Sequence, residues 1–197
     1  MKTKYFILLA TLMELTLACK PKDELNRYPL TEIDQQMLPY RLGDTVCFKD
    51  EKGNPVSFVV ADEKIDWRQI ELSLLYQYRT VILHVQQEEL EDLQIRANVA
   101  GWFFGPDYYR SVDMSINRYE TFSCGLCVYY DVIDGHFLNI PVYDSLEIGG
   151  RIFYDVAVGD DYCEKGIFAY YNKTYGILLY TNENGDTLTL QEYIPAR

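Results

Sequence analysis

Apolar and polar residues alternate with a period of two along much of the chain beyond residue 44, as in strands that bury one face. Residues 45–49 and 56–60 both alternate in this way. Between them, residues 50–54 have the sequence Asp-Glu-Lys-Gly-Asn, which is typical of a turn. The pattern therefore predicts a β-hairpin over residues 45–61.

Further segments show the same alternation, and turn residues separate them at intervals of roughly ten residues, as in all-β domains. These segments are residues 81–85, 93–99, 126–132, 152–158, 176–181 and 187–193. The spacing predicts an all-β fold, in which one antiparallel β-sandwich or barrel-like domain follows the amino-terminal segment.

Residues 65–78 are harder to assign, because their apolar residues recur at helical spacing. The composition of residues 76–85 is rich in strand-forming types, so we expect strand for most of this region. Residues 86–92 could form one acidic helical turn. The first and last predicted hairpins also share a scheme of apolar strand, turn with Gly beside Asn or Asp, and apolar strand, although this does not establish a repeat.

The amino terminus has the features of an export signal. Two lysines precede an apolar run over residues 5–13, which is too short for a bilayer span of ~20 residues but suits a signal peptide. The segment ends in alanine followed by Cys19, and this ending resembles bacterial lipoprotein signals. We therefore expect a signal peptide over 1–18, lipidation at Cys19, a lipidated tether over 19–40 and an all-β domain over 41–197.

Three segments resemble uncharacterised surface lipoproteins of the Bacteroidota. Residues 20–24 (Lys-Pro-Lys-Asp-Glu) are similar to their export tag, and residues 41–45 (Arg-Leu-Gly-Asp-Thr) to their first strand. Residues 170–176 (Tyr-Tyr-Asn-Lys-Thr-Tyr-Gly) resemble the start of their penultimate strand. The resemblance implies a fold and an address, namely the outer membrane with exposure on the cell surface, and it implies no activity.

Composition and charge restrict the classes of binding partner that we expect. Apolar residues make up 48% of the chain and aromatic residues 15%, which is enough for a folded core. The formal net charge is −12, and no basic face is visible, so we expect no nucleic-acid partner. The expected partners are the membrane, through the lipid, and either a glycan or another envelope protein.

Four cysteines remain once Cys19 is assigned to the lipid: Cys47, Cys124, Cys127 and Cys163. An even number in an exported chain permits two disulfides, and we expect Cys163 to pair with Cys124 or Cys127. One disulfide or none is also compatible with the sequence. A redox site at the Cys-x-x-Cys pair and a zinc site are alternatives, but the pair runs into a predicted strand and the spacing matches no zinc-finger pattern.

An aromatic segment between Gly101 and residue 109 is the other notable feature. Its aromatic residues are Trp102, Phe103, Phe104, Tyr108 and Tyr109. They could cap the core or, if exposed, form a platform on which sugar rings stack.

No catalytic motif is evident. The chain contains neither Gly-x-Ser-x-Gly nor His-Glu-x-x-His, and it has only two histidines. Asn182, Asn184 and Asp186 offer oxygen ligands for calcium, but a hairpin turn explains the same residues. We therefore expect no catalytic residue, no metal and no cofactor. The sequence favours a non-catalytic binding or envelope-structural module, and the alternative is an extracellular hydrolase that uses carboxylates, for example on glycans.

Overall fold

The computed structural model describes residues 26–71, 74–90, 93–101, 109–117, 126–131, 133–138, 140–161, 168–182 and 184–197. Two short helices lie in this part of the chain, α2 (Glu32–Gln36) and the 3-10 helix η2 (Glu88–Leu90). The first strands are β1 (Asn26–Tyr28), β2 (Thr45–Asp50), β3 (Pro55–Glu71), β4 (Leu74–Val85), β5 (Gln94–Ala100) and β6 (Tyr109–Asn117). The later ones are β7 (Leu126–Asp131), β8 (Phe137–Leu138), β9 (Val142–Ile148), β10 (Arg151–Asp161), β11 (Phe168–Asn172), β12 (Gly176–Thr181) and β13 (Thr187–Ile194).

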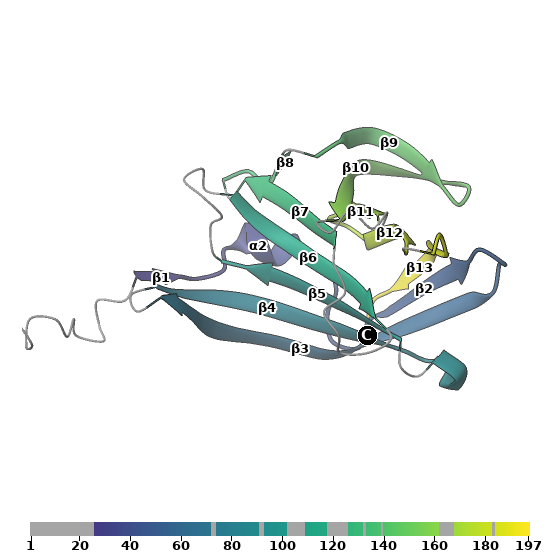
Figure 1. The fold of residues 1–197 in the computed structure, drawn as a ribbon, viewed down its shortest axis with the longest axis horizontal. Coiled ribbons are helices and arrows are strands. Elements are labelled where there is room, and N and C mark those ends of the chain that lie inside the picture. The colour runs from purple at the N-terminus through teal and green to yellow at the C-terminus, as the bar shows by residue number, and fades with distance from the viewer. Residues whose placement is uncertain are drawn as a thin grey trace, which may run out of the picture.

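Ten of the described strands close into a barrel (Figure 1). The order is β7-β6-β5-β4-β3-β2-β13-β12-β11-β10, and β10 pairs again with β7. The closing pairs join Asp160 to Cys127 and Asp161 to Leu126. Beyond this short seam, β8 pairs with β7 and β9 pairs with β10, and β1 adds to β4 in parallel. The predicted all-β fold is confirmed, and of its two forms the structure is the barrel.

The first predicted hairpin is confirmed as β2 and the first part of β3, with Val46 opposite Phe58 and Phe48 opposite Val56. These four side chains are buried. The ambiguous region around residue 70 is strand, as expected, because β3 and β4 form one long antiparallel hairpin from Phe58–Val85 to its far end. The acidic helical turn that residues 86–92 could form is present as η2.

Residues 31–40, which comprise Thr31, α2 and the four residues after it, are called the plug here, and their buried side chains lie inside the barrel. Met37, Leu38 and Tyr40 have no exposed surface, and they belong to the same apolar core as the inward-facing strand residues. The expected tether over residues 19–40 is therefore wrong for the plug, and the domain begins before residue 41. The plug has no strand alternation because it fills the barrel from within instead of joining its wall.

Neither helix in the described residues has the length and apolar character needed to span a membrane.

Candidate functional site

The plug is held by a buried polar cluster around Asp34, which is fully buried. Asp34 occupies the first turn of α2, where its side chain and that of Thr31 form a capping box. Arg110 on β6 donates through Nη1 to Asp34 Oδ2, and the Tyr130 hydroxyl on β7 donates to Asp34 Oδ1 (2.6 Å). The carboxylate is thereby engaged on both oxygens, so it acts as a structural anchor between plug and wall.

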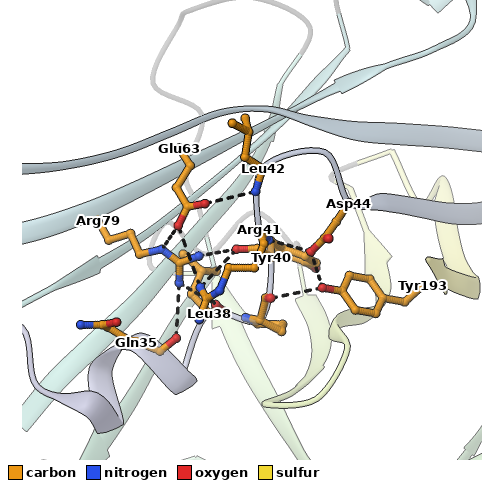
Figure 2. Close-up of polar contacts among 10 residues, drawn as sticks. Gln35, Leu38, Tyr40, Arg41, Leu42, Asp44, Glu63, Arg79 and Tyr193 are labelled. Atoms are coloured by element: carbon orange, nitrogen blue, oxygen red, sulfur yellow. Dashed lines mark hydrogen bonds and ion pairs between the residues drawn. The ribbon is translucent and has the colours of Figure 1, made fainter. Parts of the chain in front are cut away.

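Arg79 on β4 makes the second attachment, and only 1% of its surface is exposed (Figure 2). Its Nη1 donates to Leu38 O (2.7 Å) and Gln35 O (3.3 Å), and its Nη2 donates to Tyr40 O. Its Nε pairs with Glu63 Oε1 at 2.8 Å. Burial lowers the pKa of the Arg79 guanidinium, and the neighbouring Arg41 charge lowers it further, while Glu63 opposes both. Of these carbonyls, that of Gln35 lies in the last turn of α2, which leaves it without a helical partner, and those of Leu38 and Tyr40 lie in the non-helical segment that follows.

The carboxyl terminus closes the same network around Asp44 (Figure 2). Asp44 Oδ2 accepts hydrogen bonds from the Arg41 amide (2.7 Å) and from the Tyr193 hydroxyl, and its Oδ1 accepts from the Ala196 amide (2.8 Å). Burial and the Asp44 carboxylate together raise the pKa of Tyr193. Side chains of the barrel wall thus bind the polar groups of the plug, and Tyr193 and Ala196 bind Asp44, which leaves this interior cluster a structural role.

A pocket of about 540 Å³ lies at one mouth of the barrel, beside the β2–β3 and β12–β13 turns, and it is called the mouth pocket here. Apolar side chains form much of its lining: Val56, Leu90, Leu93, Ile116, Tyr180 and Leu188. The remaining lining residues are polar: Asp50, Glu51, Lys52, Asn182, Asn184, Asp186 and Thr187. Its volume is within the range of ~300–1,000 Å³ that is typical of small-molecule sites, and barrel mouths are a frequent place for them.

The β2–β3 turn is built around Asp50. Asp50 Oδ1 accepts from the backbone amides of Lys52 (2.9 Å) and Asn54 (2.7 Å), and Asn54 Nδ2 donates to Asp50 Oδ2 (2.8 Å). The hydrogen bond from the Asn54 side chain is the main reason that the pKa of Asp50 is lowered, and backbone amides add to it. Asp50 therefore carries a negative charge at neutral pH.

The β12–β13 turn repeats this arrangement with acid and amide exchanged. Asn182 Oδ1 accepts from the backbone amides of Asn184 and Asp186 (both 2.9 Å), and Asn182 Nδ2 donates to Asp186 Oδ2 (2.9 Å). Gly53 and Gly185 hold equivalent places, with φ of +85° and +84°, which explains why both turns need glycine. Since β2 and β13 are neighbours, the two matching turns stand together beside the pocket.

The sequence shows that the first and last hairpins are similar. In the structure, the matching turns of these two hairpins lie side by side and line the mouth pocket. The sequence does not reveal the apolar lining, because its residues come from β3, η2, the residue before β5, β6, β12 and β13, and the barrel alone brings them together. The only usable signal was the pair of matching turns. Asn182, Asn184 and Asp186, which offer oxygen ligands for calcium, form the hairpin turn, and the described residues hold no cluster of three or more His, Cys, Asp or Glu suited to a metal.

Both cysteines that the structure describes, Cys47 on β2 and Cys127 on β7, are free thiols. The two-disulfide arrangement, which needs all four cysteines, is therefore wrong, and so is the pairing of Cys163 with Cys127. Burial, and after it the nearby Asp113 carboxylate, raise the pKa of the Cys127 thiol. A redox or zinc-binding cysteine needs the opposite shift. Cys124 and Cys163 lie outside the described residues.

Two other predicted features also lie outside the described residues. One is the lipidation site Cys19 with the whole signal segment. The other is the aromatic platform of Trp102, Phe103, Phe104 and Tyr108; the last platform residue, Tyr109, begins β6, but its side chain is not described.

No protein-family model matches the chain, and neither the curated proteins nor the solved structures give a match.

Proposed function

We propose that this chain is a non-catalytic binding module that takes a small amphipathic molecule in the mouth pocket. The observation that carries the proposal is the pocket itself, which combines an apolar lining with a polar rim at an open barrel end. We further propose that lipid on Cys19 anchors the module to the outer membrane, exposed on the cell surface. The signal segment, the export tag and the Bacteroidota resemblance support this address.

The pocket supports a ligand with an apolar body and a polar or cationic head. Leu93, Ile116 and Leu188 would cover the apolar body. Burial of ~150 Å² of apolar surface stabilises a complex by about 4 kcal/mol before the cost of association. Among the charged lining residues, acids outnumber Lys52, and Asp50 stays ionised. This balance favours a neutral or positively charged head over an anionic one.

The hydrolase alternative has less support. A carboxylate-based hydrolase needs one carboxyl with a raised pKa and one ionised carboxylate in a common cleft. In the mouth pocket, the pKa of Asp50 is lowered and Asp186 accepts a hydrogen bond from an amide of its own turn. Asp113, a carboxyl whose pKa burial raises, does not line the pocket.

Titration with the neutral probe N-phenyl-1-naphthylamine tests the binding proposal. The proposal predicts saturable fluorescence enhancement at one site, lost in Ile116→Arg because the guanidinium would occupy and charge the apolar lining. Ile152→Arg is the matched control, since Ile152 is 62% exposed and lies outside the pocket. A response without saturation, or one that Ile116→Arg leaves intact in a folded protein, would contradict the proposal.

Metabolic labelling with palmitate tests the anchor separately. Wild-type chain in a bacterial host that processes lipoproteins should incorporate label, and Cys19→Ala should not. Protease treatment of intact cells then tests surface exposure, because a protein on the inner leaflet would be protected. Persistent labelling of Cys19→Ala would place the lipid elsewhere and refute this anchor.

A further inference from the structure

The path of the chain restricts where a lipid on Cys19 can lie. Strand β1 is pinned in parallel to the start of β4, with Asn26 opposite Leu74 and Tyr28 opposite Tyr76. Asn26 is seven positions after Cys19 in the sequence, and such a segment spans at most ~25 Å when fully extended. A lipid on Cys19 would therefore lie within about 25 Å of the point where β3 ends and β4 begins. The region around this point is called the hairpin end here, and it consists of β1 and residues 62–71 and 74–79.

The mouth pocket lies at the other end of the same strands. Asp50 and the β2–β3 turn precede Pro55, the first residue of β3, whereas the hairpin end contains Glu71, its last residue. Seventeen strand residues at ~3.3 Å each separate the two ends by roughly 50 Å. Figure 1 shows β1 and the far end of β3 toward one end of the long axis, and the β2–β3 turn toward the other.

The hairpin end exposes two large apolar side chains, Ile65 (49%) and Trp67 (40%). They are two residues apart on β3, so they point to the same face of the hairpin. Tryptophan is the side chain that best suits the boundary between water and hydrocarbon, because its ring is apolar and its N–H is polar.

The charge of the hairpin end also differs from that of the rest of the chain. Residues 26–28 and 62–79 hold four acids and four bases, so this end is neutral in a chain of net charge −12. The remaining surface therefore carries the negative charge and is repelled by anionic lipid, whereas the hairpin end is not. Arg27 and Arg68 are exposed there and can reach lipid phosphates.

We propose that the hairpin end rests on the bilayer that holds the lipid, with Ile65 and Trp67 in its interface, so that the mouth pocket faces away from the membrane. This inference rests on the proposed lipidation at Cys19. It deepens the proposed function, because a pocket held on the far side would take its ligand from the surroundings of the cell and not from the membrane lipid.

Fluorescence quenching in vesicles tests the orientation. The chain has two tryptophans, so Trp102→Phe leaves Trp67 as the only one. The lipidated full chain would be reconstituted into phosphatidylcholine vesicles with and without a nitroxide near the glycerol end of the acyl chains. We expect the nitroxide to reduce Trp67 emission at least twofold. The matched control carries Lys52→Trp with both native tryptophans changed to Phe, and its emission should fall by less than a tenth.

Flotation of the vesicles separates the ways in which the inference could fail. Protein that does not float with the vesicles lacks a working lipid anchor, and this result overturns both the anchor and the orientation. Protein that floats but leaves Trp67 unquenched overturns the orientation alone. Equal quenching of Trp67 and of the Lys52→Trp probe would mean that the barrel lies flat or tumbles, which also overturns it.

Discussion

Replacing Arg79 by leucine should destabilise the barrel strongly, because this one side chain binds the plug to the wall. The guanidinium donates to the carbonyls of Gln35, Leu38 and Tyr40 and pairs with Glu63, and only 1% of its surface is exposed. Leucine would leave these acceptors without their donor. Each buried, orphaned carbonyl costs ~1–3 kcal/mol, and removing one partner of a buried ion pair costs ~3–5 kcal/mol.

Because Glu63 is partly exposed, water can replace some of the lost ion pair. The carbonyls of the fully buried Leu38 and Tyr40 alone would cost ~2–6 kcal/mol. With part of the ion-pair cost added, we expect Arg79→Leu to lower the free energy of unfolding by roughly 3–8 kcal/mol, out of a total of ~5–15 kcal/mol for an ordinary domain. Urea unfolding followed by tryptophan fluorescence and circular dichroism measures this value. Hydrogen exchange at residues 37–40 should also accelerate.

Two further variants bracket the effect. Arg79→Lys keeps the charge but loses the planar fork, so its loss should fall between wild type and Arg79→Leu. Arg96→Leu changes an exposed arginine on the neighbouring strand β5 and should stay within ~0.5 kcal/mol of wild type. A loss below ~1 kcal/mol for Arg79→Leu, or one no larger than that of Arg96→Leu, would refute the reasoning.

Three other predictions concern the core. Gly176→Ala should abolish the cooperative transition in the same urea assay, because a Cβ there would clash with the Tyr40 hydroxyl and the backbone φ is +75°. Tyr130→Phe should lower the free energy of unfolding by ~1–2 kcal/mol, since the fully buried Asp34 carboxylate loses the hydrogen bond of 2.6 Å from the Tyr130 hydroxyl. Burial raises the pKa of Asp113, so ionisation of this carboxyl opposes folding and its contribution to the stability of the wild type should be lost as pH rises from ~4 through the folded pKa. Asp113→Asn should abolish that loss; an unchanged pH profile would contradict the assignment.

The alternation of side chains predicted most strands of the barrel wall, but not β6 (Tyr109–Asn117) or β11 (Phe168–Asn172). Val46, Phe48, Phe58 and Val60 face the core as the period of two requires. The sequence could not distinguish a sandwich from a barrel, because closure depends on the short β7–β10 seam, and no local pattern encodes which strands meet there.

The burial of the plug inside the barrel could not be predicted for a different reason. Its residues have the composition of a linker, with Pro39 and a five-residue helix, and their burial depends on distant side chains such as Arg79 and Arg110. Nothing near residues 34–40 in the sequence indicates that these two arginines will bind them inside a barrel. The mouth pocket has the same character, since Ile116 and Leu188 become neighbours only when the barrel forms.

Methyl NMR of the isoleucine-, leucine- and valine-labelled protein, titrated with N-phenyl-1-naphthylamine, is the most direct test of the mouth pocket as a ligand site. The account predicts that the largest shifts fall on pocket methyls, those of Val56, Leu93, Ile116 and Leu188, and that they saturate together with the fluorescence. Saturating shifts confined to other methyls, such as that of the exposed Ile152, would place the binding site elsewhere and contradict the account.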